Sequence, residues 1–269
     1  MTLVSHRKRF IFLKTHKTAG TSVEVALEPL CAPADAETGA HYRNALISEA
    51  GIIGARGGDT AGQVWKNHMS ARSVRRLLGR RVWARYVKIA TVRNPYPRMV
   101  SMFHSRMSAD ERIEVAEASF DEVRRRFLRW LEGRWLSNNL GKLTIGSRYV
   151  IDHVVYFERL EEDWPALAQG LGLSAAPLPR LKSGRNLRAE PWMDYYDEAG
   201  RNLVERGSAF ELAFFGYSFA ASEAGGPCES SAALRALRVL RSDPKRALGG
   251  LRPPGRKLAF RVDAAGPRA

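Results

Sequence analysis

Cysteine is scarce in this chain of 269 residues, which contains only Cys31 and Cys228. Two cysteines are too few for a disulfide framework or a cysteine metal cluster, so we expect both to be packing or surface thiols. Long apolar runs are missing as well, since no stretch approaches the roughly 20 apolar residues of a membrane-spanning helix. No recurring period indicates a repeat architecture. These absences favour an ordinary globular fold.

Acidic residues are few relative to basic ones, with 28 Asp and Glu against 43 Lys and Arg and a formal net charge of +15. Such a charge favours anionic partners, whether a nucleotide, an acidic polysaccharide, nucleic acid or an anionic membrane. The basic residues are spread along the chain, without a zinc-finger, RNA-recognition or clear helix-turn-helix signature. We therefore predict no nucleic-acid partner.

The order of apolar and polar segments predicts an α/β fold. Strands are expected at residues 10–14, at 86–92 and within 149–157. Helices are expected at residues 21–30, 71–79, from 95 onward, at 120–133 and at 163–170. This alternation predicts a central parallel sheet of four or five strands with helices on both faces. Residues 31–66 form a Gly- and Ala-rich insertion in which we expect short helices.

The length of the chain and its hydrophobic content of 45% suit one substantial core, so we predict a single domain over residues 1–219. Residues 220–269 contain ten Lys or Arg against four Asp or Glu, and we expect a basic, largely disordered tail. The apolar run FIFL at residues 10–13 is too short for a signal peptide. We expect a soluble cytoplasmic protein without a transmembrane segment, and peripheral association with the inner face of the membrane stays open.

The first candidate site is the turn between FIFL and the helix TSVEVALEPL, within LKTHKTAGTS. A strand, a short polar loop and a helix in that order present backbone N–H groups to an anion. Gly20 permits close approach of the backbone, and Lys17 supplies a mobile charge. Hydroxyl donors come from Thr18, Thr21 and Ser22. The pattern predicts a phosphate or sulfate site, with an ordinary strand-to-helix turn as the alternative.

The second candidate site follows the strand at 86–92, within TVRNPYPRMVSMF. Arg93 is placed at the carboxyl end of that strand, where open α/β sheets bind ligands. Pro95 suits the first turn of the following helix, where a missing N–H costs little. Ser101 is a second anchor for the same anion, whereas Arg98 either joins them or pairs with an acid at the surface. Two anion sites indicate a ligand with two phosphate-like ends.

With both motifs in place, the chain resembles the sulfotransferase superfamily that uses 3′-phosphoadenosine 5′-phosphosulfate (PAPS), in particular its carbohydrate branch of Golgi-type and heparan-sulfate-like enzymes. LKTHKTAGTS is similar to the family's 5′-phosphosulfate loop, and TVRNPYPRMVSMF to its 3′-phosphate motif R-[ND]-P-x-x-R-x-x-S. Weaker likenesses are YFERLEEDW, at residues 156–164, and FFGY, at 214–217. The resemblance covers about residues 9–219. It implies a P-loop-like α/β domain. Many enzymes of this branch have a Golgi membrane anchor, which we do not find in this sequence, so we expect a soluble bacterial member of the superfamily.

The resemblance implies an enzyme of the EC 2.8.2 type that transfers a sulfuryl group from PAPS, its donor substrate, to a hydroxyl of a carbohydrate or glycoconjugate, without a metal. The nucleotide-binding residues that it implies are Lys17, Thr18, Ala19, Gly20, Thr21, Ser22, Arg93, Ser101 and Arg185. Arg185 lies in a basic loop that also contains Lys182, and Trp65 and Trp192 are candidates for stacking on adenine or sugar. The alternatives are a small-molecule kinase of similar fold, which requires the loop G-x-x-x-x-G-K-[ST] that is missing here, and a non-catalytic anion- or polysaccharide-binding module.

In-line sulfuryl transfer requires charge stabilisation at the leaving phosphate and a base for the acceptor hydroxyl. Lys17 suits the first role because a compact ammonium can follow the bridging oxygen, and Lys14 is its alternative. Histidine is the usual base near neutral pH. His68 is the predicted base because it lies between the two motifs, in an interval where several carbohydrate sulfotransferases place a histidine. His16 and Glu24 are the alternatives.

Overall fold

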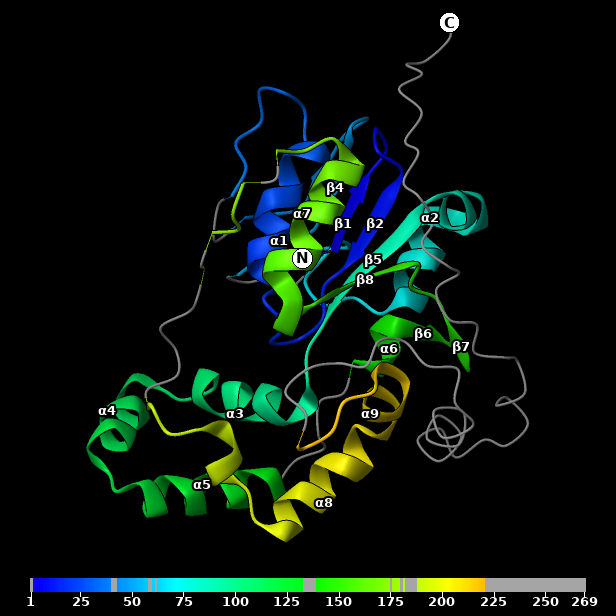
Figure 1. The fold of residues 1–269 in the computed structure, drawn as a ribbon. Helices are drawn as coiled ribbons and strands as arrows, with labels where there is room; N and C mark the ends of the chain where they lie inside the picture. The colour runs from blue at the N-terminus through cyan, green and yellow to red at the C-terminus, as the bar shows by residue number, and fades with distance from the viewer. Residues whose placement is uncertain are drawn as a thin grey trace, which may run out of the picture.

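The computed structural model describes residues 2–39, 43–57, 60, 62–132, 139–174, 176–179, 181 and 188–220. The predictions for Lys182, Arg185 and Cys228, and those for the tail beyond residue 220, lie outside these ranges. Within them, a central sheet carries helices on both of its faces (Figure 1). Cys31 is a buried free thiol, as predicted for a packing residue.

The described strands of the central sheet are six in number and have the order β3-β4-β1-β2-β5-β8. Their bounds are β1 (Thr2–Ser5), β2 (Phe10–Leu13), β3 (Leu46–Ile47), β4 (Gly51–Ile53), β5 (Val87–Val92) and β8 (His153–Tyr156). Strands β2, β5 and β8 pair in parallel, so their carboxyl ends lie at the same edge of the sheet. The other three strands extend the sheet through antiparallel pairs.

The predicted α/β class is confirmed, and the sheet is larger than the four or five strands predicted. The expectation of short helices within residues 31–66 is wrong, because β3 and β4 form a hairpin there. In β4, Gly51 lies opposite Ser5 of β1. Strand β1 is too short for a clear periodic signal, and it is stabilised by neighbours on both sides, β2 and β4. Those backbone partners are supplied by the tertiary structure.

Successive side chains of β2 point to opposite faces of the sheet, as expected for a strand. Phe10 and Phe12 are buried in a core with helices α1 (Gly20–Leu27) and α7 (Leu160–Leu171). Ile11 and Leu13 are buried in a second core with α2 (Ala71–Arg85) and α9 (Ala209–Phe215). Figure 1 shows α1 and α7 together on one side of the sheet and α2 on the other.

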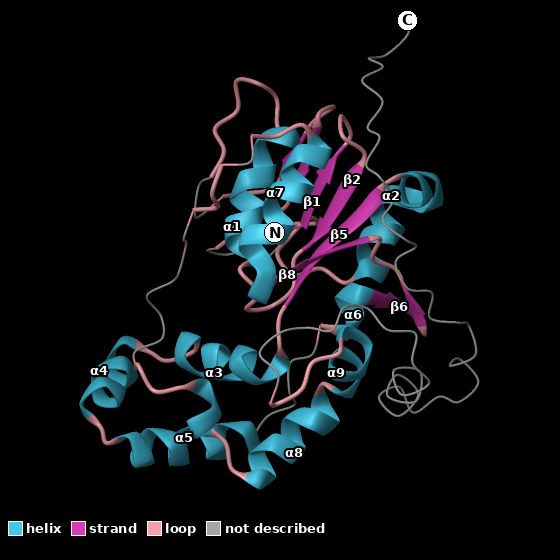
Figure 2. Cartoon of the chain, in the orientation of Figure 1, coloured by secondary structure: helices cyan, strands magenta, loops and turns pink. Residues whose placement is uncertain are grey.

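A third core lies among helices beyond the sheet, which Figure 2 shows as a separate helical group. Its elements are α3 (Pro95–Ser105), α4 (Ala109–Glu117), α5 (Phe120–Glu132), α8 (Glu198–Gly207) and the 3-10 helix η4 (Trp192–Tyr195). The remaining short elements are η1 (Glu28–Leu30), α6 (Leu140–Leu143), β6 (Thr144–Ile145), β7 (Arg148–Tyr149) and η2 (Phe157–Arg159). Across the described ranges, none of the helices combines the length and the apolar character needed to cross a bilayer.

Side chains cap the N-termini of two helices whose starts the sequence predicts. The Ser70 hydroxyl accepts a hydrogen bond from the backbone N–H of Ser73 at the start of α2. Pro95 occupies the first position of α3, preceded by the capping side chain of Asn94. The predicted end of a helix at Gly79 is confirmed, because Gly79 adopts the non-helical values φ +78° and ψ 163° inside α2. A second helical segment, which was not predicted from the sequence, follows this kink and ends at Arg85.

We predict that Gly51→Ala strongly destabilises the sheet. A Cβ atom at Gly51 would overlap the carbonyl oxygen of Val4 and lie 3.0 Å from that of Cys31. Both are backbone atoms, so relief requires a shift of β1 or of the loop after η1, and overpacking of this kind costs about 1–3 kcal/mol or more. Gly141→Ala is the control, since a Cβ there meets no atom within 4 Å. Urea unfolding of both variants measures the difference, and equal stabilities would contradict the expectation.

Candidate functional site

A cavity of about 820 Å³ opens at the edge of the sheet where β2, β5 and β8 end. Of the site residues predicted from the sequence, the cavity is lined by Lys17, Thr18, Ala19, Gly20, Thr21, Ser22, His68, Arg93 and Ser101. Arg185 lies outside the described residues. The structure therefore gathers, around one hollow, residues that the sequence separates by more than 80 positions.

The loop between β2 and α1 has an unusual backbone. Lys17 and Ala19 adopt left-handed conformations, with φ +59° and +55°. Such conformations are costly for residues other than glycine, and they gather where function demands a particular backbone shape. A Cβ atom on Gly20 would lie 3.0 Å from Cγ of Lys14, so the glycine allows the tight fit between helix and strand. The result is a helix N-terminus that opens onto the cavity.

Two of the predicted hydroxyl donors bind the protein itself. The Thr18 hydroxyl lies 2.7 Å from the hydroxyls of both Thr15 and Thr91, and all three residues are buried. This cluster attaches the loop to β5. The Ser22 hydroxyl accepts a hydrogen bond of 3.4 Å from the backbone N–H of Leu181, which also lines the cavity. These side chains thus hold the walls of the cavity in place.

Arg93 supplies the second cationic wall. Its Nη1 donates to the carbonyl oxygen of Lys17 at 3.3 Å, and its guanidinium carbon lies 3.9 Å from the centre of the Phe157 ring. Burial lowers the pKa of Arg93 to about 10, so the group stays charged at neutral pH. Its Nε is buried without a hydrogen-bond partner among the described residues. A buried donor without an acceptor is unfavourable, so a bound anion would be stabilised here. Ser101, on α3, lines the same cavity.

Arg98 does not belong to this site. It is fully buried, and its Nη2 lies 2.9 Å from Oε2 of Glu211 in α9. This settles the open choice from the sequence in favour of pairing with an acid, and the acid is buried rather than at the surface.

The tryptophans chosen from the sequence do not line the cavity. Trp65 packs in the core beside α2, and Trp192 packs among the helices of the third core. The aromatic side chains that line the cavity are Phe157 and Trp164, and the indole N–H of Trp164 donates to the carbonyl oxygen of Ala176 at 3.0 Å. Both lie in the segment YFERLEEDW, whose resemblance to the family was the available signal.

Glu24 and Lys14 neutralise each other. Nζ of Lys14 lies 2.5 Å from Oε2 of Glu24, and both side chains are buried. Arg56 adds Nη1 at 3.5 Å from Glu24 and at 3.3 Å from Glu28. A buried carboxylate paired in this way is a poor general base, and a paired lysine is a poor substitute for Lys17. Within the described ranges, no group of three or more His, Cys, Asp or Glu is arranged to hold a metal ion.

The two histidines of the cavity form a stacked pair, with ring centres 3.9 Å apart. Nδ1 of His68 lies 3.2 Å from the carbonyl oxygen of Lys14, which can only accept, so Nδ1 carries the proton and Nε2 has the free lone pair. Burial, together with the charges of the neighbouring histidine and Lys14, lowers the pKa of His68 to about 2. Burial and the charge of Lys142 lower the pKa of His16 to about 3. Both rings are therefore neutral at pH 7.

Comparison with known proteins gives one result. The model of a family described as the sulfotransferase family matches residues 1–189. The match includes both predicted anion-binding loops, His68, and the aromatic residues Phe157 and Trp164 of the cavity. Searches among curated proteins and among solved structures found no significant match.

We predict that the histidine pair makes stability depend on pH above the range where carboxylates titrate. Because the pKa of His68 is lowered, the unfolded chain binds more protons than the folded one below about pH 6.5, so the free energy of unfolding falls as the pH falls. His68→Gln should reduce this loss between about pH 7 and about pH 5, where most carboxylates remain ionised. Urea unfolding at both pH values is the measurement. An unchanged pH dependence, or an NMR pKa for His68 near the ordinary value, would contradict this account.

Proposed function

We propose that this chain, which belongs to the sulfotransferase family, transfers a sulfuryl group from PAPS to a hydroxyl of a carbohydrate or glycoconjugate. The observation that supports this most is the meeting of two anion-binding loops in one cavity of about 820 Å³. Such a volume is within the range of nucleotide-sized ligand pockets, about 300–1,000 Å³. A donor with a phosphosulfate at one end and a second phosphate at the other matches the two loops.

Each wall of the cavity has a proposed role in holding the donor. The loop from Lys17 to Ser22, with the N-terminus of α1, would bind the 5′-phosphosulfate. Arg93 and Ser101 would bind the 3′-phosphate, and the unpartnered Nε of Arg93 supports this assignment. Phe157 and Trp164 offer flat apolar surfaces for adenine. The donor would supply an activated sulfuryl group with 3′,5′-diphosphoadenosine (PAP) as the leaving group.

The chain's own residues then have two tasks in the transfer. Nε2 of His68 would accept the proton of the acceptor hydroxyl, while its Nδ1–H bond to the carbonyl oxygen of Lys14 keeps the required tautomer and stabilises the protonated ring. The ammonium of Lys17 would balance the negative charge that grows on the leaving phosphate. The negative charge of a bound donor would raise the pKa of His68, which would strengthen the base.

We predict that PAP raises the melting temperature of the protein far more than AMP or ATP with Mg²⁺ does. Arg93→Ala should remove most of that difference, because a hydrogen bond to a charged group contributes about 1.5–3 kcal/mol, or roughly tenfold to a hundredfold in affinity. Arg159→Ala is a matched control, since its guanidinium also stacks on an aromatic ring, that of Tyr156, but it does not line the cavity. Equal stabilisation by PAP and AMP would refute the 3′-phosphate assignment.

We predict that Lys17→Ala and His68→Ala retain PAP binding and lose turnover, because both side chains act mainly in the transition state. In the wild type, kcat/KM should stay flat as the pH falls through about 6.5, because it reports the low pKa of His68 in the free enzyme. The acidic limb of kcat should lie at higher pH, since the donor raises that pKa. Isothermal titration with PAP and a transfer assay across pH measure these quantities. Near-normal turnover of His68→Ala would exclude His68 as the base.

A further inference from the structure

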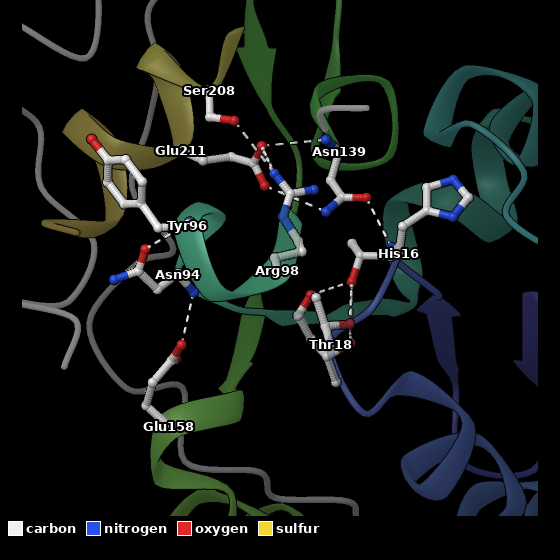
Figure 3. Close-up of polar contacts among 11 residues, drawn as sticks. His16, Thr18, Asn94, Tyr96, Arg98, Asn139, Glu158, Ser208 and Glu211 are labelled. Carbon is white, nitrogen blue, oxygen red and sulfur yellow. Dashed lines mark hydrogen bonds and ion pairs between the residues drawn. The ribbon is translucent and has the colours of Figure 1, made fainter. Parts of the chain in front are cut away.

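A chain of polar contacts connects helix α9, which lies beyond the family match, to the loop that carries Lys17. Figure 3 shows the Glu211 carboxylate in contact with both Arg98 and Asn139. Nη2 of Arg98 lies 2.9 Å from Oε2 of Glu211. The backbone N and the side-chain Nδ2 of Asn139 each donate to Glu211 at 3.4 Å. Oδ1 of Asn139 then accepts from the backbone N–H of His16 at 2.9 Å.

The three side chains of this chain of contacts are buried, and burial restricts their orientations. Arg98, Asn139 and Glu211 are exposed by only 0%, 1% and 3%. In such surroundings a polar group left without a partner is costly, so each member fixes the orientation of the next. The carboxylate of Glu211 orients the amide of Asn139 with Nδ2 toward itself, and this leaves Oδ1 pointing toward His16.

Asn139 precedes a helix that its side chain does not cap. It occupies the N-cap position of α6, where an asparagine side chain normally accepts a hydrogen bond from the first turn of its own helix. In this structure the side chain makes no capping bond to α6, and its Oδ1 accepts a hydrogen bond from the backbone N–H of His16 instead. Local helix stability therefore does not account for the placement of the side chain.

The contact holds the loop immediately before Lys17. On the other side, the buried hydroxyl cluster holds Thr18 against Thr91. Lys17, with its left-handed backbone, is thus fixed from both directions. The His16 ring also stacks on that of His68, so the same contact helps to place the proposed base.

A second set of contacts brings the same C-terminal region to the Arg93 loop. The hydroxyl of Tyr217 donates to Oε2 of Glu158 at 2.9 Å, and Oε1 of Glu158 accepts from the backbone N–H of Asn94 at 2.7 Å. Nδ2 of Asn94 donates to the carbonyl oxygen of Ser218 at 3.1 Å. The segment from Glu211 to Ser218 therefore reaches both anion-binding loops.

We propose that Glu211 and Asn139 are positioning residues for sulfuryl transfer, acting through the backbone of His16 on Lys17 and His68. The inference rests on the proposed function. Misplacement of a catalytic group by about 1 Å can reduce a rate a hundredfold. Loss of this contact should therefore lower kcat much more than it lowers affinity for the nucleotide.

The first test compares Asn139→Ala with Thr144→Val. Thr144 is a matched control, because it is buried at the other end of α6 and its hydroxyl donates to the carbonyl oxygen of Leu140. We expect Asn139→Ala to lower kcat by about tenfold to a hundredfold, with the Kd for PAP changed less than about threefold. Thr144→Val should retain kcat at a similar loss of melting temperature. Equal kcat in the two variants would overturn the proposal.

The second test is a rescue. Asn139→Asp retains an acceptor for the His16 N–H but places a carboxylate against Glu211, so it should lose activity. Adding Glu211→Gln replaces that repulsion with an amide donor, keeps the total charge, and should restore kcat to within about fivefold of the wild type, because contacting pairs are not additive. Failure of the pair to exceed either single variant would count against the connection through these two residues.

A third measurement separates this inference from the proposed function. Hydrogen exchange of the His16 amide, followed by NMR without ligand, should be faster in Asn139→Ala than in Thr144→Val, and unchanged exchange would refute the contact. If the wild type binds PAP and Asn139→Ala keeps full kcat, only the positioning role fails. If the wild type shows no stabilisation by PAP, the proposed function fails, and the catalytic role of both residues fails with it.

Discussion

The parallel pairing of β2 with β5 is the constraint on which the site depends. In this register Leu13 lies opposite Ala90, so the loops that follow the two strands leave the sheet at the same edge. The hydrogen bond from Arg93 to the Lys17 carbonyl oxygen joins these loops directly. A shift of one residue in the register would turn every side chain of the strand to the other face and separate the two cationic groups. The two predicted anion-binding motifs therefore line one cavity because of a backbone interaction.

The basic side chains around the cavity differ in whether an acidic side chain neutralises them. Lys14 is buried, and its ammonium is neutralised by Glu24, with Arg56 beside the same carboxylate. Arg93 is held against Phe157 and retains a buried Nε without a partner in the described part of the chain. The histidines between them are neutral because burial disfavours their charged forms. The lining of the cavity thus combines cationic side chains with neutral histidines, and the Lys14–Glu24 ion pair supports the loop.

The backbone of the loop also has an energetic cost. Left-handed conformations at Lys17 and Ala19 are each less favourable than ordinary ones by roughly 1–2 kcal/mol. They persist because neighbouring groups define the loop: Thr91 from β5, Asn139 from α6 and Arg93 from the turn after β5. Several distant segments thus stabilise a shape that the loop would not adopt alone.

The sequence by itself determined the local elements and the residue types of the site. Apolar runs and caps identified β2, β5, α1 and α3, and the two motifs identified Lys17, Arg93 and Ser101, because strand, helix and anion-binding signals are encoded over a few neighbouring residues. Only the tertiary structure decided that β1, β3 and β4 complete the sheet and that Glu24 is paired with Lys14. It also decided that the cavity is lined by Phe157 and Trp164 and not by Trp65 and Trp192. The connection of Glu211 to His16 through Asn139 likewise appears only in the folded chain. These features depend on hydrogen bonds, ion pairs and packing between segments far apart in the chain, and such contacts leave no periodic or local pattern in the sequence.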